Sequence, residues 1–228
     1  MHRSATETRD YYQLKLGEDF GRDYYYAFSE YCDVWLTWKQ YCGLFQHSPE
    51  RVQLLNKAGS AFFARVQRNF FEFVILGICR ITDPAESGKG QKKQNLTIRR
   101  FDRFLEVPEH REKFSDLINI ASDETAFARD WRNRHISHCD YQVLTGASIL
   151  EEATGVKIKS ALRAIFNVFL FVEREITKGD LSDNVIDDLN NELVLLEPSR
   201  HLRKVCVMDA MFIPRFRSGF RVVQGSKP

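Results

Sequence analysis

The sequence lacks a run of about twenty uninterrupted apolar residues, the length that a helix needs to cross a bilayer. The first residues, Met1 to Glu7, also lack the apolar core of a secretion signal. From these two absences we expect neither a membrane-spanning helix nor a secretion signal. We therefore expect a cytoplasmic protein that does not enter a membrane.

Cysteine is sparse: the 228 residues contain five, and no two of them form a Cys-x2-Cys pair. This argues against a disulfide framework and against a structural zinc site, and it favours buried thiols. His135 and His138 are three residues apart and offer two imidazoles to an ion, but no His-Glu-x2-His motif is present. Ser87-Gly88-Lys89-Gly90 lacks the remaining residues of a phosphate-binding loop. The sequence predicts no metal, no cofactor and no hydrolysis of nucleoside triphosphates.

Charge is distributed unevenly along a chain whose formal net charge is only +2. Residues 200–228 contain seven lysines and arginines against one aspartate, which gives +6 there and leaves −4 for the rest. A basic tail on an acidic body suits RNA, because neutralising phosphates supplies most sequence-independent affinity. A solvated or partner-bound terminus explains the same pattern. We divide the chain into a helical domain, 1–196, and a basic C-terminal tail, 197–228.

Apolar residues recur at steps of three and four in three long segments, which predicts amphipathic helices. The stripe of the first segment is Phe28, Tyr31, Trp35, Trp38, Cys42 and Phe45. The stripe of the second, which starts at Pro49, is Leu55, Phe62, Val66, Phe70, Phe73, Gly77 and Ile81. The stripe of the third, which ends near Lys178-Gly179, is Ile158, Leu162, Ile165, Phe169, Val172 and Ile176. Phe62 and Phe166 are both expected in the core.

Weaker signals divide the rest of the chain. Proline, glycine and polar residues in 83–94 predict a mobile loop, and shorter helices are expected at 98–105 and 108–120. Ser122, followed by Asp123 and Glu124, resembles the cap of a fourth main helix. Beyond Asp180 we expect a helix near 181–196 and extended segments at 205–212 and 216–223. The predicted fold is all-α: four main helices with short extra ones.

The segment Trp131-Arg132-Asn133-Arg134-His135-Ile136-Ser137-His138-Cys139-Asp140 concentrates groups suited to phosphodiester chemistry. Arginine is permanently charged and presents a planar fork of donors to phosphate. Histidine, with an unperturbed pKa of about 6.5, exchanges protons near neutrality. On a regular helix Arg132 and His138 lie about 120° apart, whereas Arg134 and His138 share a face. A distorted helix, or two copies of the motif meeting in a dimer, brings Arg132 to His138.

The spacing resembles the signature of the HEPN superfamily, an arginine and a polar residue followed by a histidine after four to six intervening positions. Arg132, Asn133 and His138 match it, and Trp131, Asp140 and the aromatic helix around Trp35–Trp38 resemble the AbiU-type abortive-infection branch. The resemblance covers about residues 20–180. It implies an up-and-down helical bundle, a homodimer with its cleft between two motifs, and a role as a toxin or antiviral defence effector accompanied by an antitoxin.

The resemblance also implies a reaction: a metal-independent endoribonuclease that cleaves RNA by attack of the 2′-hydroxyl. Arg132, Asn133 and His138 are the expected catalytic residues. Arg134, His135 and Asp140 are expected to bind RNA or to support the catalytic groups. Two alternatives stay open: a non-catalytic module that binds a nucleotide, an RNA or a protein, and a purely structural helical dimer.

Overall fold

The structure is a computed structural model that describes residues 4–88, 90–179 and 181. The helices in chain order are α1 (Ala5–Leu16), α2 (Glu18–Tyr41), η1 (Cys42–Gln46), α3 (Pro49–Thr82), η2 (Ile98–Phe104), α4 (Pro108–Glu124), α5 (Ala126–Trp131), η3 (Arg132–Ile136), α6 (Tyr141–Leu144), α7 (Gly155–Phe171) and η4 (Val172–Thr177). η2 is a 3₁₀-helix, and η1, η3 and η4 are π-helical turns. The predictions for the segment past 181, including the basic tail, lie outside the described residues.

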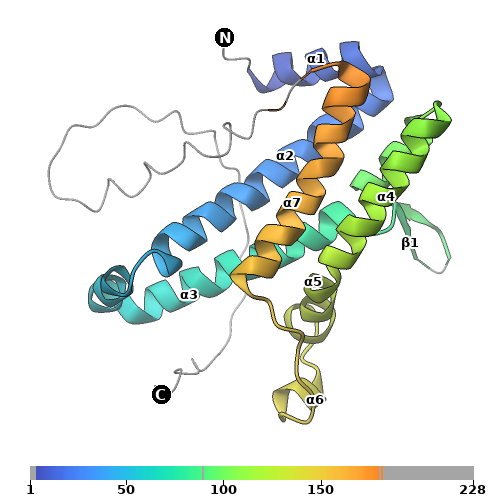
Figure 1. The fold of residues 1–228 in the computed structure, drawn as a ribbon. Helices are drawn as coiled ribbons and strands as arrows, with labels where there is room; N and C mark the ends of the chain where they lie inside the picture. Colours follow the sequence, from blue (N-terminus) through green and yellow to red (C-terminus); the bar gives the residue numbers. More distant parts are fainter. Residues whose placement is uncertain (1–3, 89, 180, 182–228) are drawn as a thin grey trace, which may run out of the picture.

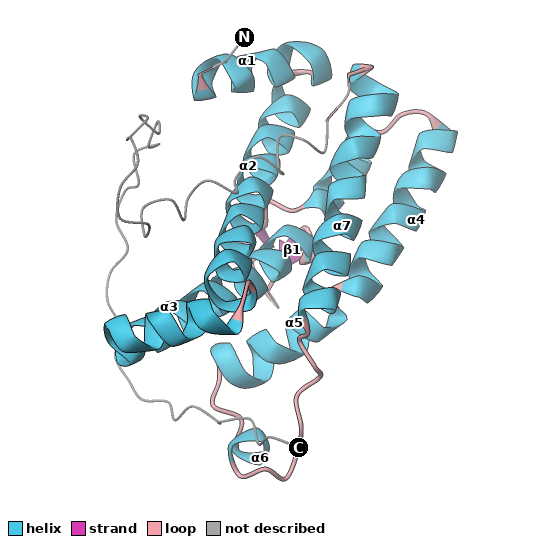
Figure 2. Ribbon diagram, turned by 60° about the vertical axis from the view of Figure 1, so that its left-hand side comes forward, coloured by secondary structure: helices cyan, strands magenta, loops and turns pink. Residues whose placement is uncertain are grey.

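The main helices form a bundle, which confirms the all-α prediction. In Figures 1 and 2, α2, α7 and α4 run side by side, and α1 lies across one end of α2. α3 packs on α2, and α4 packs on α7. α5 contacts α3 near the opposite end of the bundle from α1, so the signature segment begins there.

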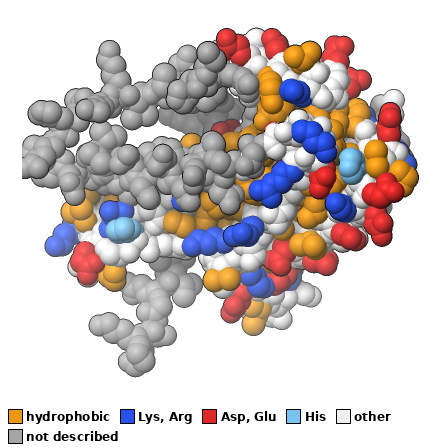
Figure 3. All heavy atoms as spheres, turned by 45° about the horizontal axis from the view of Figure 1, so that its top comes forward, with side chains coloured by type: hydrophobic (Ala, Val, Ile, Leu, Met, Phe, Trp, Pro, Cys, Tyr) orange, Lys and Arg blue, Asp and Glu red, His pale blue; other side chains and the backbone are white. Residues whose placement is uncertain are grey.

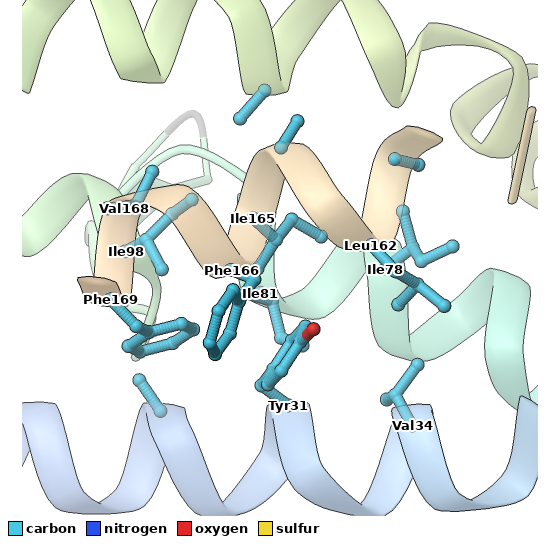
Figure 4. Packing of buried hydrophobic residues seen from close by; sticks show 14 of the residues in the cluster. Tyr31, Val34, Ile78, Ile81, Ile98, Leu162, Ile165, Phe166, Val168 and Phe169 are labelled. Atoms are coloured by element: carbon cyan, nitrogen blue, oxygen red, sulfur yellow. The ribbon is translucent and has the colours of Figure 1, made fainter. Parts of the chain in front are cut away.

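The core lies where α2, α3 and α7 meet. Figure 4 shows Tyr31 and Val34 of α2 facing side chains from the other two helices. Ile78 of α3 and Ile165 of α7 are fully buried. Phe166 is 6% exposed, which confirms that it belongs to the core. A continuous apolar core built partly from aromatic rings therefore holds the bundle together.

The crossing of α2 and α3 depends on a glycine. A Cβ atom added at Gly77 would lie 2.1 Å from Cγ2 of Val34, well inside contact distance. Any side chain at this position would push the two helices apart. Gly77 thus belongs to the buried stripe because of its small size.

The expectation that Phe62 belongs to the core is wrong. Phe62 is 65% exposed, and Gly59 just before it has non-helical backbone angles that kink α3. Phe62 follows the kink, so the kink separates only Leu55 from the rest of the stripe, and Phe62 is exposed because it lies in the first half of α3. In Figure 2 the first half of α3 extends beyond the other helices.

Two other predictions from the sequence differ from the structure. Residues 83–94 include a small antiparallel hairpin, in which β1 (Glu86–Ser87) pairs with β2 (Lys93–Gln94), rather than only irregular loop. Ser122 is not a cap: α4 continues to Glu124, and the Ser122 hydroxyl donates to the carbonyl of Ile118 one turn back. Serine and threonine can make such a bond inside a helix, so the sequence signal was ambiguous.

Candidate functional site

The signature segment leaves the bundle through a π-helical turn. η3 continues α5, and the N–H of Ser137 donates to the carbonyl of Arg132 at 2.8 Å, five residues back. The helix ends at Ile136, so His138 lies outside it, in the bend that precedes α6. Angles calculated for a regular helix therefore do not apply, and Arg134 and His138 do not share a helical face.

Arg132 is fixed by an acidic residue that the sequence interpretation missed. Its Nη1 atom lies 2.5 Å from Oδ2 of Asp83, the residue that follows α3, and both side chains are 24% exposed. Its Nε atom donates to Oδ1 of Asn133 at 3.1 Å. The arginine is thus oriented from two sides while part of it stays accessible. Forty-nine residues separate Arg132 from Asp83, so no local pattern announces the pair.

His138 is exposed and makes no hydrogen bond or ion pair with the described part of the chain. Its neighbour Cys139 is an exposed free thiol. The structure therefore joins Arg132 to Asn133 but does not bond His138 to either of them within one copy of the chain. An imidazole in this position is open to a ligand or to a second copy.

Arg134 ties together the segment that contains His138. Its Nη1 atom donates to Oδ1 of Asp130 and its Nε atom to Oδ2 of Asp140, each at 3.3 Å. It also donates to the hydroxyl of Ser148 and to the carbonyl of Ile149. These bonds span the turn from both sides. Arg134 therefore fits the expectation of a supporting residue better than that of an RNA contact.

Asp140 holds the start of α6 as well as Arg134. Its Oδ1 atom accepts hydrogen bonds from the N–H groups of Gln142 at 2.9 Å and Val143 at 3.1 Å. The Val143 N–H holds the pKa of Asp140 below its ordinary value, and Arg134 adds to this effect. The carboxylate is therefore charged at neutral pH and stabilises the turn immediately after His138.

Trp131 and His135 form the inner side of the segment. Their rings meet edge to face with centroids 5.4 Å apart, and Trp131 makes a similar contact with Phe71 of α3 at 5.0 Å. The indole N–H of Trp131 donates to the carbonyl of Glu151 at 2.7 Å. His135 is half-buried in this arrangement, which suits support rather than proton transfer.

The face at the α1 end of the bundle, away from the signature segment, carries both signs of charge. Figure 3 shows basic and acidic side chains interspersed with apolar patches on the face that it draws. No group of three or more potential ligands suited to a metal ion occurs among residues 4–88, 90–179 and 181. Within the same residues no helix has the length and apolarity to span a membrane.

The chain matches a known protein family. The model of a HEPN family described as AbiU2 matches residues 17–194, which is more than half of the chain. The matched region runs from the start of α2 past η4 and contains every candidate site residue. No curated protein and no solved structure matches the chain significantly.

Proposed function

The chain belongs to the HEPN family AbiU2, and we propose that it is a metal-independent endoribonuclease of a bacterial defence or toxin–antitoxin system. The observation that carries this proposal is the contrast between the two signature side chains. Arg132 is oriented by Asp83 and Asn133, whereas His138 is exposed on an ordered turn with its imidazole available. A fixed cation and an accessible proton carrier in one short segment suit phosphodiester cleavage.

In the proposed reaction the ribose 2′-hydroxyl of RNA attacks the adjacent phosphorus. The bond to the 5′-oxygen of the next nucleotide breaks, which leaves a 2′,3′-cyclic phosphate and a 5′-hydroxyl. His138 takes the proton from the 2′-hydroxyl or gives one to the departing 5′-oxygen. Arg132 stabilises the negative charge that develops on the phosphoryl oxygens.

Asn133, Arg134, Asp140 and His135 act around these two groups. Asn133 holds the Arg132 guanidinium through its amide oxygen, and its exposed amide nitrogen is available to phosphate. Arg134 and Asp140 fix the turn that presents His138. His135 packs on Trp131 and keeps the π-turn in place.

We propose that a second copy of the chain completes the site. Cleavage needs both a base and an acid, and one copy of the signature offers a single exposed histidine, because His135 is half-buried against Trp131. A symmetric dimer with the two His138 turns facing one cleft supplies both. An antitoxin that covers this cleft would silence the enzyme.

The test is cleavage of total cellular RNA without divalent metal, with the 3′ ends mapped chemically. Wild-type protein should yield cyclic phosphate ends, and His138→Ala should lose nearly all cleavage while keeping its helical spectrum. His47→Ala is the matched control because His47 is also exposed but lies between η1 and α3, outside the signature. Undiminished cutting by His138→Ala would refute the assignment.

A second function is favoured by the ion pair itself. Arg132 and Asp83 neutralise each other, and a pair of this kind also suits a rigid, non-catalytic surface that binds RNA or a protein. Such a module would bind RNA without cutting it. Equal weakening of RNA binding by Arg132→Ala and His138→Ala, with no product from wild type, would favour this function.

A further inference from the structure

Two arginines outside the signature are bonded to the same serine. Arg99, on η2, donates from Nη2 to the hydroxyl of Ser122 at 2.5 Å and from Nε to the carbonyl of Thr82 at 2.9 Å. Arg129, on α5, donates from Nη2 to the carbonyl of Ser122 at 3.1 Å and from Nη1 to the hydroxyl of Thr125 at 2.8 Å. The two guanidinium groups are therefore close neighbours.

This pair adjoins Arg132 through the end of α3. Thr82, which Arg99 binds, immediately precedes Asp83, which Arg132 binds. Asp83 is the single carboxylate of the described residues that is bonded to any of the three arginines. Three guanidinium groups against one carboxylate leave a surplus of two positive charges.

The surplus is unfavourable without an anion. Partial burial lowers the pKa of Arg99, and the nearby charge of Arg129 lowers it further, while Asp83 opposes both effects. Each arginine also keeps a nitrogen with no partner in the part of the chain that the structure describes: Nη1 of Arg99, Nε of Arg129 and Nη2 of Arg132. Unused donors beside uncompensated charge are what a phosphate group binds.

The positions of these arginines also have a structural explanation. Thr82 ends α3 and Ser122 lies in the last turn of α4, where a cation interacts favourably with the helix dipole. This role accounts for the anchoring bonds of Arg99 and Arg129. The helix dipole does not account for the repulsion between the two arginines or for their unused N–H donors.

We infer that Arg99 and Arg129, beside Arg132, form a phosphate subsite for the RNA backbone. Arg132 contacts the phosphate that is attacked, and the other two arginines bind a neighbouring phosphate and so place the strand. The identity of the ligand as RNA rests on the proposed function. The subsite itself rests on the charge surplus and the donors.

The test is binding of a 2′-O-methyl RNA oligonucleotide, which has no free 2′-hydroxyl and cannot be cleaved by the proposed route. Affinity is measured by fluorescence anisotropy over a range of salt concentrations. Losing one phosphate contact flattens the slope of log affinity against log salt by about 0.7 for a single strand. Arg99→Gln and Arg129→Gln should each produce a change of that size.

Two kinds of control separate charge from structure. Arg9→Gln removes an equal charge on α1, at the opposite end of the bundle in Figure 1, and should leave the slope unchanged. Arg99→Lys and Arg129→Lys keep the charge and should keep most of the slope. A thermal melt of each variant reports whether it is folded.

A wild-type slope in folded Arg99→Gln and Arg129→Gln would overturn the subsite. If either glutamine variant does not fold, Asp83→Asn provides the decision: the larger positive surplus should tighten binding, and unchanged affinity overturns the inference. Cleavage of unmodified RNA is assayed separately. Absence of cleavage with altered slopes would end the nuclease proposal but keep the subsite.

Discussion

The α7 side of the bundle and residues 130–151, which contain the signature segment, are held by different forces. α7 buries nine of its residues, most of them large and apolar, whereas neither η3 nor α6 has a buried residue. Apart from the packing of Trp131 and Ile136 on the core, residues 130–151 are held by hydrogen bonds and ion pairs, with Arg134 at their centre. Burial stabilises a fold globally, whereas a partly solvated polar network stabilises only its own surroundings. The core and the site should therefore fail separately.

The largest effect is expected from opening the core. Phe169 is fully buried and contacts Tyr24, Phe28 and Tyr31, so Phe169→Ala should lower the free energy of unfolding by about 3–5 kcal/mol. Phe62→Ala is the matched control and should cost less than about 0.5 kcal/mol, because its ring is exposed. Urea denaturation measures both. Equal losses would show that the Phe62 ring is buried in the core.

A smaller effect is expected where α2 crosses α3. Gly77→Ala places a methyl group against Val34, and the overpacking should cost about 1–3 kcal/mol although alanine favours helix more than glycine does. Gly155→Ala is a suitable comparison, since the nearest atom to its new Cβ is 3.4 Å away. Stabilisation by Gly77→Ala in the same urea assay would contradict the close crossing.

The core should also respond to alkali. Burial raises the pKa of Tyr24 well above its ordinary value of 10.0, and the charge of Glu173 raises it further. The unfolded chain then ionises first, so this contribution to stability is complete below pH 10.0 and is lost as the pH rises above it. In Tyr24→Phe the free energy of unfolding should fall less steeply above pH 10.0, as measured by urea denaturation at a series of pH values. If the stability of this variant fell as steeply as that of wild type, groups other than Tyr24 would be responsible for the loss of stability in alkali.

The signature segment should respond to acid instead, and only locally. The pKa of Asp140 lies below its ordinary 3.8, chiefly because Val143 donates to it. Its contribution is therefore present above pH 3.8 and is lost as the pH falls through the lower folded value. Hydrogen exchange of the Gln142 and Val143 amides should accelerate there before the bundle unfolds. Asp140→Ala, which removes the accepting oxygen, should already show fast exchange of these amides at pH 7. Equally accelerated exchange of the α7 amides would contradict the view that the site and the core unfold separately.

The comparison also separates what sequence patterns predict from what they do not. The stripes of α2 and α7 were predicted because burial imposes a period on the apolar residues, and the bundle follows from that period. α1 was missed although Ser4 and Glu7 form a capping box at its start, which is a readable signal. Ser122 misled because its hydroxyl serves equally as a cap or inside a helix.

The site was predictable only as a set of residue types. Arg132, Asn133 and His138 follow from the signature, and their roles remain proposals. The π-turn that moves His138 off the helix is followed by a turn that Arg134 and Asp140 bridge, and no periodicity in the sequence reveals either feature. Asp83 and Arg129 reach the site through the tertiary fold, so only coordinates show them.

The ion pair between Arg132 and Asp83 couples the two regions at a single point. Asp83 directly follows the last turn of α3, and its N–H donates to the carbonyl of Cys79 within the core helix. A substitution deep in the bundle that shifts the end of α3 would therefore misalign the arginine without touching the histidine. Variants of this kind would keep His138 in place but lose the orientation of the Arg132 guanidinium. A packing defect far from the site would then have the same effect as a substitution of Arg132 itself.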